Sequence, residues 1–408
     1  MNSLPYAAPR YPAIAPSRKI PCVLALAAAA LVALPAAALA GGQPGAAAPQ
    51  SQLADAGLSQ AGRDLILTVR TAAPVPLAQL EARPDTRRAA SRYLCLALSR
   101  AGSAGERRLC LGGPRARHRV GLVVVDGSGK PIEKSSARAT VRRPNASKLV
   151  VALVPADAGV LPHRYRWRLI ESRGCEPGNR CAESLPAQRS LAFRLRPVRP
   201  VGCTGGSPGL VTNGPRDRKV VALTFDDGPS EYTDGFLQVL REKGVNGTFF
   251  EVGQEMPGRE ATMRQILAEG NEIGDHTMNH VEYPGYSQIA GAASRIAAYT
   301  HFRPCLFRPP GGGVNSSVVA TAGSLGMRTV NWDVDPRDWS TPGTGAIYSN
   351  IVGNAQPGSI ILMHDGGGPR GETLAALPQI IDALRARGYG FETVTQLLGY
   401  RLQYRPYG

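Results

Sequence analysis

The segment VVALTFDDGPS, at residues 220–230, joins an apolar, strand-like run to two adjacent carboxylates and a Gly-Pro turn. Similar apolar runs follow it: GTFF, NEIGD, LFRPP, TVNWDV, SIILMH and GFETV. Helical stretches separate them, near 258–269, 287–299, 315–326, 346–354 and 373–387. Alternation of strand and helix is typical of parallel βαβ units. We therefore predict an α/β domain over residues 219–402, most simply a barrel.

The part of the chain that precedes this domain has a different pattern. Short strand-like runs such as LILTV, VGLVVV and KLVVALV are separated by turn sequences between residues 63 and 198. This spacing predicts an all-β, sandwich-like domain. The Pro-rich stretch at 199–218 is predicted to be a linker, and the small, polar residues 41–62 a flexible tether.

The N-terminus has the features of a secretory signal peptide. Arg10, Arg18 and Lys19 precede an apolar run that ends in small residues, which predicts a signal over residues 1–40 with cleavage after Ala40. The alternative is an uncleaved anchor, the one case in which we expect a membrane partner. Either alternative predicts a secreted or cell-envelope protein.

Cysteine usage agrees with export. Of seven cysteines, Cys22 lies in the predicted signal, and six in an exported protein indicate three disulfides. Short spacing favours Cys95–Cys110 and Cys175–Cys181, which leaves Cys203–Cys305 to tie the linker to the α/β domain. A metal cluster is the alternative, but no pair of cysteines has CxxC spacing.

Polar residues gather where the apolar runs of the α/β domain end. The carboxyl ends of barrel strands and the loops after them form one face, on which active sites are built. Five segments fall there: Asp226-Asp227, His276 with His280, Arg308, Asp335 to Trp339, and His364-Asp365. Three of the six histidines of the chain are among them, so we expect a catalytic site at this face.

The Asp226-Asp227 pair is the first candidate. Two carboxylates that close a buried strand are costly to desolvate unless a cation or hydrogen-bond donors satisfy them. Adjacent side chains on extended backbone point in opposite directions, so one can bind a metal while the other faces a substrate or water. The alternative is a simple Asp-Asp-Gly-Pro turn.

His276 and His280 have the i, i+4 spacing that places two imidazoles on one side of a helical turn. Together with Asp227 they make a common catalytic zinc set, with a coordination position open for water. The alternative is a pair of surface histidines without a ligand.

His364 ends another apolar run, where it could be a hydrogen-bonded core residue or a third metal imidazole. We favour an acid role, with Asp338 holding the ring and raising its pKa. Arg308 could simply be a salt-bridge partner. Trp339 could be a core aromatic residue or a stacking surface for a sugar.

Five segments together resemble a known family. TFDDGPS (224–230), HTMNH (276–280), RPPGG (308–312), DPRDW (335–339) and LMH (362–364) resemble the ordered motifs of the polysaccharide deacetylases, the NodB-homology or carbohydrate esterase 4 family. The resemblance implies a distorted (β/α) barrel that hydrolyses acetyl groups on a polymeric sugar with a divalent metal, usually zinc.

The resemblance also implies a role for each residue that matches a motif. It implies that Asp226 is the catalytic base and that Arg308 pairs with it. The implied metal ligands are Asp227, His276 and His280. The implied catalytic acid is His364, whose pKa Asp338 tunes. Trp339 and Leu362 are implied to line the cleft. The family often carries an aromatic residue where this chain has Gly311, whose backbone N–H can still serve as an oxyanion donor while one groove wall is lost.

The predicted function is metal-dependent removal of N-acetyl groups from an extracellular or cell-wall polysaccharide. Peptidoglycan N-acetylglucosamine is the first candidate substrate and chitin-type oligomers are the second. Two alternatives stay open: an O-acetyl esterase acting on a xylan-like polymer, and a catalytically silent carbohydrate-binding protein.

The charge of the chain is unevenly placed. Residues 1–200 hold 30 basic and 11 acidic side chains, whereas residues 201–408 hold 17 and 20. As a hypothesis, the basic front domain holds the protein to an anionic cell-wall polymer through salt-sensitive attraction. The alternative is a solvated basic surface on a packing domain. Nucleic acid fits poorly with export, so we predict no nucleic-acid partner.

Overall fold

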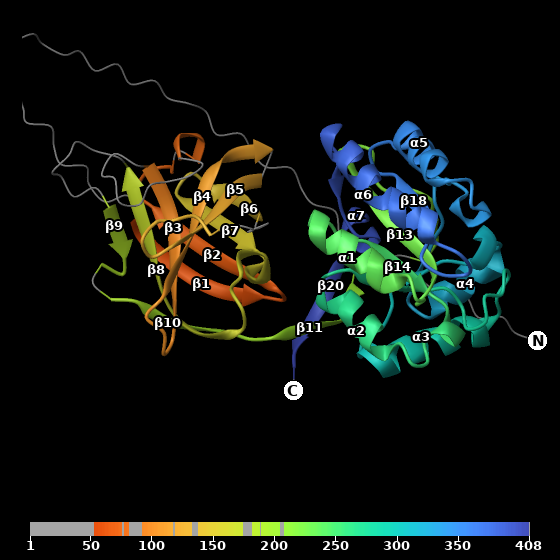
Figure 1. Ribbon diagram of the computed structural model, residues 1–408. Coiled ribbons are helices and arrows are strands. Elements are labelled where there is room, and N and C mark those ends of the chain that lie inside the picture. Colours follow the sequence, from red (N-terminus) through yellow and green to blue (C-terminus); the bar gives the residue numbers. More distant parts are fainter. Residues whose placement is uncertain are drawn as a thin grey trace, which may run out of the picture. The chain divides into compact units, whose positions relative to one another are not determined.

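The structure is a computed structural model that describes residues 53–75, 77–80, 92–116, 119–132, 138–173, 182–187, 189–204 and 208–407 (Figure 1). The predicted signal peptide, residues 41–52 of the predicted tether and the predicted Cys175–Cys181 disulfide lie outside these ranges. Within them, none of the helices combines the length and the apolar character needed to cross a bilayer.

The described residues between 53 and 195 form an all-β domain, as predicted. Its strands are β1 (Leu53–Ala61), β2 (Asp64–Thr71), β3 (Arg92–Arg100), β4 (Glu106–Ala116), β5 (Arg119–Asp126), β6 (Arg138–Asn145), β7 (Lys148–Leu153), β8 (His163–Arg173), β9 (Ala182–Leu185) and β10 (Leu191–Leu195). They form one antiparallel sheet in the order β1-β2-β7-β6-β5-β4-β3-β8-β10, and β9 pairs with β8. The strands thus make a single hydrogen-bonded sheet, which differs from a sandwich of two separate sheets.

Alternation along the strands builds the core of this domain. Leu65, Leu67 and Val69 of β2 are buried, and the side chains between them are less so. Leucines and valines from the other strands, with Trp167, complete the same apolar cluster. Burial of alternate residues is the signature of a sheet with one face on a core.

Two predicted boundaries are wrong. Residues 53–61 of the predicted tether form β1, in which Leu53 is buried and Ala56 and Leu58 pack against the core. Most of the predicted linker is also ordered: β11 (Val198–Thr204) pairs with β20 (Arg401–Pro406), and β12 (Leu210–Val211) joins the parallel sheet. The reason is that alternate apolar residues and long-range pairing outweigh a composition rich in small residues and proline.

Two of the predicted disulfides are confirmed. Cys95 and Cys110 are direct cross-strand partners in β3 and β4 and are bonded to each other. Cys203 of β11 is bonded to Cys305, which immediately precedes β16 (Leu306–Phe307).

Removing the Cys203–Cys305 bridge by a double Cys→Ser change is expected to lower the free energy of unfolding by about 2–4 kcal/mol. The bridge spans 102 residues, against 15 for Cys95–Cys110, so it restricts the unfolded chain more. Denaturant titration of both double variants measures the effect. A larger loss for the 95/110 pair would contradict this loop-length argument.

The rear part of the chain is built on a parallel sheet. Its strands are β12, β13 (Val220–Gly228), β14 (Thr248–Glu251), β15 (Glu272–Asp275), β16, β17 (Arg328–Val330), β18 (Ile360–His364) and β19 (Gly390–Phe391). They follow the order β12-β17-β16-β15-β14-β13-β18, and β19 pairs with β13. Two bridges bring the ends of that order together: Asn213, just after β12, pairs with Ser359, and Val334, just after β17, pairs with Ile361 of β18. The curled sheet agrees with the predicted distorted barrel.

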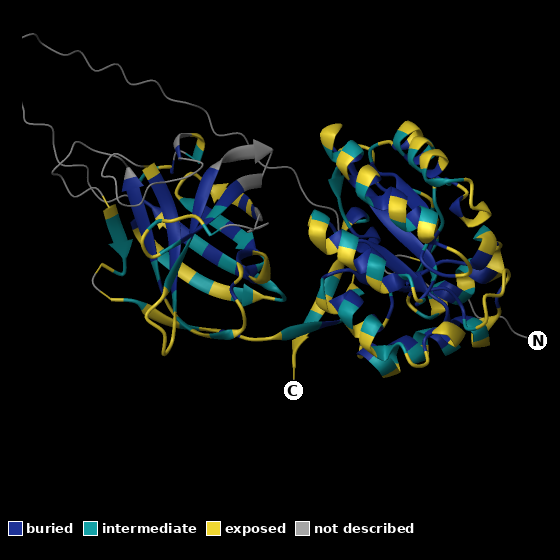
Figure 2. Ribbon diagram, in the orientation of Figure 1, coloured by how far each residue is buried: buried dark blue, intermediate teal, exposed yellow. Residues whose placement is uncertain are grey.

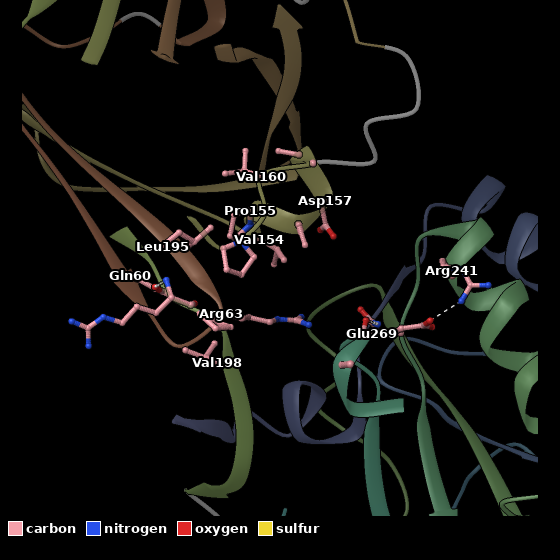
Figure 3. Close-up of a pocket in the computed structure, with 18 of the residues that line it drawn as sticks. Gln60, Arg63, Val154, Pro155, Asp157, Val160, Leu195, Val198, Arg241 and Glu269 are labelled. Carbon is pink, nitrogen blue, oxygen red and sulfur yellow. Dashed lines mark hydrogen bonds and ion pairs between the residues drawn. The ribbon is translucent and has the colours of Figure 1, made fainter. Parts of the chain in front are cut away.

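Helices follow most of these strands, as the sequence predicts. They are α1 (Thr233–Lys243), α2 (Glu260–Ala268), α3 (Tyr286–Thr300), α4 (Ser316–Ser324), α5 (Thr344–Asn354), α6 (Gly371–Ala386) and α7 (Val394–Leu397). An ion pair of 2.6 Å between Arg241 of α1 and Glu269, which follows α2, links the ends of two neighbouring helices (Figure 3).

Strand β13 shows how this fold positions the site. Val221, Leu223 and Phe225 pack with the helices, while Ala222 belongs to a separate apolar cluster on the other face of the sheet. The strand is buried on both faces, as Figure 2 shows for much of the parallel sheet. Continuing the alternation, Asp226 falls on the same face as Ala222, at the carboxyl end of the strand.

Candidate active site

The structure brings the predicted segments together at the carboxyl ends of the parallel strands. Asp226 of β13 is in register with His364 of β18, and His276 directly follows β15. Arg308 directly follows β16, and its backbone N–H bonds to the carbonyl of Asp275. The convergence follows from the parallel order, since strands that run in one direction end at one edge.

Asp227, His276 and His280 offer ligand atoms that lie within 4.8 Å of one another. Oδ1 of Asp227 is 3.3 Å from Nε2 of His276 and 3.0 Å from Nε2 of His280. Ligand atoms that each lie about 2.1 Å from a tetrahedral zinc ion are about 3.4 Å from one another. Oδ1 of Asp227 is also buried without a hydrogen-bond partner in the described part of the chain. The three residues therefore fit a divalent metal.

The charge states of Asp227 and His276 suit the binding of a cation. Burial by itself would raise the pKa of Asp227, but the two imidazoles beside it outweigh burial and hold the pKa below its ordinary value. Nδ1 of His276 lies 2.7 Å from the carbonyl oxygen of Arg308, so the N–H at Nδ1 donates to it and leaves Nε2 free for a metal. The side chain of His276 is buried, whereas that of His280 is 45% exposed, so the site opens to solvent beside His280.

The predicted helical turn over 276–280 is wrong. Residues 276–280 lie outside the helices, and Thr277 and His280 have φ values of 69° and 56°. The backbone N–H of Thr277 donates to Oδ1 of Asp275, and that of Val281 to the Thr277 hydroxyl. Because an α-helix requires negative φ, the imidazoles meet through an irregular loop.

Asp226 is held by a buried arginine. Nη1 of Arg308 donates to Oδ1 of Asp226 at 2.7 Å and to the Thr224 hydroxyl at 2.8 Å. The other Asp226 oxygen, Oδ2, lies 3.8 Å from Nε2 of His276. Burial lowers the pKa of Arg308, which the charge of Asp226 opposes. One oxygen of Asp226 is therefore anchored, and the other faces the metal-ligating set.

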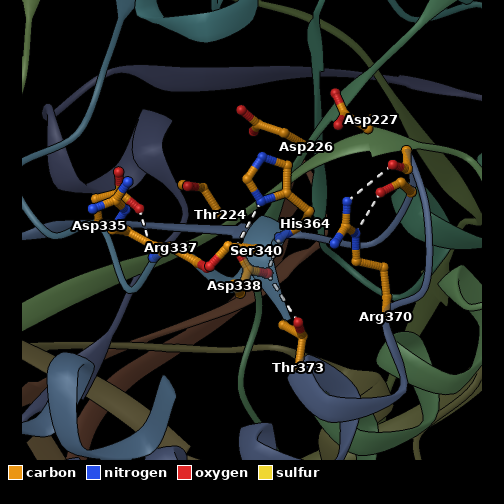
Figure 4. A network of polar contacts seen from close by, with 12 residues as sticks. Thr224, Asp226, Asp227, Asp335, Arg337, Asp338, Ser340, His364, Arg370 and Thr373 are labelled. Atoms are coloured by element: carbon orange, nitrogen blue, oxygen red, sulfur yellow. Dashed lines mark hydrogen bonds and ion pairs between the residues drawn. The ribbon is translucent and has the colours of Figure 1, made fainter. Parts of the chain in front are cut away.

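His364, at the end of β18, pairs with Asp338. Its Nδ1 is 2.7 Å from Oδ1 of Asp338, and Oδ2 of the same carboxylate accepts from the His364 backbone N–H and from the Thr373 hydroxyl. Burial alone would lower the pKa of His364, but the hydrogen bond and charge of Asp338 raise it above the ordinary value. Figure 4 shows the imidazole between Asp338 on one side and the Asp226-Asp227 pair on the other.

The residues predicted to line the cleft differ in exposure. Trp339 is 48% exposed, with the Arg337 guanidinium 5.2 Å from its ring centre, whereas Leu362 is buried. Gly311 has a φ of 60°, and a Cβ at this position would contact the side chain of Glu282. Glu282, which the sequence analysis did not single out, thus occupies space beside the missing aromatic residue.

A buried acid lies beside Asp365, next to Gly228 of β13, and the sequence did not single it out: Glu251. Glu251 and Asp365 are buried completely, and a Cβ on Gly228 would lie within 3 Å of both carboxyl groups. Burial raises the pKa of Asp365 to about 7, and it raises the pKa of Glu251 well above its ordinary value. Both acids end or follow apolar strand runs, the signal that singled out Asp226.

A cavity of about 630 Å³ adjoins the metal-ligating set. Asp227 and His280 lie in its wall, together with Tyr232, Glu231 and Arg259. The mixed polar and aromatic lining offers hydrogen bonds and a stacking surface to a hydroxyl-rich ligand.

Comparisons with known proteins found a matching family model and several similar proteins. The family model described as polysaccharide deacetylase matches residues 213–330. A peptidoglycan-N-acetylglucosamine deacetylase from Bacillus cereus is 42% identical over 196 residues, which cover 46% of this chain and 92% of the relative. A chitooligosaccharide deacetylase from a Bradyrhizobium species is 35% identical, over 43% and 90% of the two chains.

Among solved structures, a peptidoglycan N-acetylglucosamine deacetylase in complex with a benzamide ligand is 31% identical and covers 47% of this chain and 92% of its own, with a TM-score of 0.45. The aligned relatives are matched over nearly their whole length, and the family model covers three of the five motifs quoted above, at 224–230, 276–280 and 308–312. The chain therefore belongs to the polysaccharide deacetylase family.

Proposed function

We propose that the protein removes N-acetyl groups from a cell-wall or extracellular polysaccharide, with peptidoglycan N-acetylglucosamine as the first substrate and chitin-type oligomers as the second. One observation carries the proposal: three metal-ligand side chains converge beside the Asp226 carboxylate, which is in register with His364 on the neighbouring strand. The relatives' names, peptidoglycan-N-acetylglucosamine deacetylase and chitooligosaccharide deacetylase, support this substrate class. The predicted signal peptide supports action outside the cytoplasm.

The ligands Asp227, His276 and His280 favour zinc, because two imidazoles and one carboxylate with an open position form a common catalytic zinc set. When bound, zinc would polarise the acetyl carbonyl and make a coordinated water more acidic. The cavity next to Asp227 and His280 would admit the sugar chain to this position.

Asp226 acts as the general base in this proposal. Its Oδ2 faces the metal-ligating residues, where it can accept a proton from the attacking water. Arg308 fixes the carboxylate through Oδ1, so Oδ2 is kept in one orientation. The backbone N–H of Gly311 is assigned to the developing oxyanion, a contact whose strength increases as negative charge forms.

His364 acts as the general acid. An amine leaves poorly unless it is protonated, so the imidazolium delivers a proton to the sugar nitrogen as the C–N bond breaks. Asp338 accepts the N–H at Nδ1 and thereby directs Nε2 toward the substrate. Exposed Trp339 supplies a stacking face for a sugar ring.

Replacing Asp338 with asparagine is expected to shift the alkaline limb of the kcat–pH profile to lower pH by about one unit or more. A general acid must be protonated, so kcat falls as pH rises through the His364 pKa, and loss of the Asp338 charge lowers that pKa. Asp335→Asn is the matched control, since Asp335 accepts from the Arg337 backbone. If the alkaline limb of the kcat–pH profile lay at the same pH in both variants, His364 would not be the general acid.

Acetate release from defined polymers tests the proposed function. The purified protein is incubated with peptidoglycan, chitooligosaccharides and acetylxylan, with and without a chelator, and both acetate and free amines are measured. We expect release from the N-acetylated polymers that the chelator abolishes and zinc restores. Faster release from acetylxylan would favour an O-acetyl esterase, and binding without acetate would favour a silent carbohydrate-binding protein.

A further inference from the structure

Strand β8 of the front domain has two chemically distinct faces. Tyr165, Trp167 and Leu169 pack into the apolar core of the domain. The residues between them, Arg164, Arg166 and Arg168, must point to the opposite face because successive side chains of a strand alternate. Arg164 and Arg166 are exposed to solvent. A strand of the sheet therefore carries three consecutive outward arginines.

Neighbouring strands extend this row. Arg194 of β10 is directly opposite Arg164, and Ala192 is opposite Arg166. On the other side, Ala97 of β3 lies between Arg168 of β8 and Arg108 of β4. We call the outward set Arg108, Arg164, Arg166, Arg168 and Arg194 the arginine face.

The arginine face is poorly compensated. Glu106 pairs with Arg108 at 2.7 Å and with Arg168 at 3.1 Å. Within the described residues, no carboxylate forms an ion pair with Arg164, Arg166 or Arg194. Like charges directly opposite each other on two strands destabilise a sheet. The Arg164–Arg194 pair therefore costs the folded state stability, which an anionic ligand would recover.

We propose that the arginine face binds a linear phosphodiester polymer of the kind found in cell walls, independently of the catalytic site. Alternate residues of a strand are about 6.6 Å apart and opposite residues of paired strands about 5 Å apart, so the guanidinium groups form a closely spaced array. Each planar guanidinium can bind two oxygens of one phosphate. Such an array suits a chain that carries a phosphate at every repeat.

The surroundings favour a polymer that lacks nucleobases. Binding of single-stranded nucleic acid relies on exposed aromatic rings on which bases stack. The aromatic residues of β8 and β10, Tyr165, Trp167 and Phe193, pack toward the core. Small side chains, Ala192 and Ala97, separate the arginines. Phosphate recognition without base stacking is the chemistry that this face offers.

Binding of soluble poly(glycerol phosphate) by the chain of residues 41–408 tests the proposal. Affinity is measured by calorimetry over a series of salt concentrations for wild type and for the triple variant Arg164→Gln, Arg166→Gln, Arg194→Gln. We expect the variant to bind at least tenfold more weakly at low salt and to show a smaller salt slope, because fewer counterions are released. Its acetate release from chitooligosaccharides should equal that of wild type.

Two further variants of this chain make the test specific. Arg70→Gln, Arg142→Gln, Lys148→Gln removes the same charge from β2, β6 and β7, and it should lose less than threefold in affinity. The variant Arg164→Lys, Arg166→Lys, Arg194→Lys should keep part of the binding, since the positive charge remains. Equal loss in both glutamine triples, absence of wild-type binding, or tighter binding of poly(dT) or polygalacturonate would each overturn the proposal. Thermal unfolding verifies that all variants are folded.

Discussion

Replacing Asp227 with alanine is expected to lower metal affinity at least about 100-fold and the deacetylation rate at least about 1,000-fold. Asp227 supplies the only carboxylate of the three-ligand set, and its Oδ1 lies within 3.3 Å of both imidazole nitrogens. Without this negative charge, two neutral imidazoles bind a divalent cation weakly. Metal content after gel filtration and acetate release measure the two losses separately.

The control for this change is Asp234→Ala, which removes an exposed carboxylate from helix α1. It should keep both metal and activity. Because the imidazoles hold the pKa of Asp227 below its ordinary value, the ionised carboxylate stabilises the folded apo protein at neutral pH, and we expect the apo variant to unfold at a similar or lower temperature than apo wild type. A variant that retained stoichiometric metal would show that the cation is bound elsewhere, and the site assignment would fail.

The convergence of the candidate residues could be predicted from the sequence because its signal is local. In β13 the apolar alternation continues into Asp226, so one strand fixes which face that carboxylate occupies. Parallel topology then brings His276, Arg308 and His364 to the same edge. Strand ends and parallel topology thus sufficed to place Asp226, Arg308 and His364 at one edge of the sheet.

Features set by distant contacts could not be predicted in this way. The loop at 276–280 has i, i+4 histidines but left-handed residues, because the Asp275 carboxylate holds the Thr277 backbone. Thr373 reaches Asp338 from helix α6, across 35 residues of sequence. Strand β1 was hidden by its small and polar composition and is visible only through its pairing with β2. In each case tertiary contacts override the local pattern.

Replacing Asp226 with asparagine is expected to lower kcat about 100- to 10,000-fold while metal binding is retained. The amide has nearly the shape of the carboxylate, and its oxygen can still accept from Arg308, but it cannot take a proton from water at neutral pH. The metal ligands Asp227, His276 and His280 are unchanged. Single-turnover acetate release, with metal content measured on the same sample, separates the base from the ligands.

The Asp226→Asn change has a second effect, because it leaves the Arg308 charge buried without its counterion. Removal of one partner of a buried ion pair costs about 3–5 kcal/mol of stability, so unfolding must be measured alongside kcat. Thr224→Val is the matched control, because it also deprives Arg308 of a buried acceptor but leaves the carboxylate in place. If Thr224→Val lowered kcat as much as Asp226→Asn, the loss would reflect a disturbed arginine, and Asp226 would not be the base. A loss confined to Asp226→Asn, in folded and metal-loaded protein, would identify the carboxylate as the group that accepts the proton.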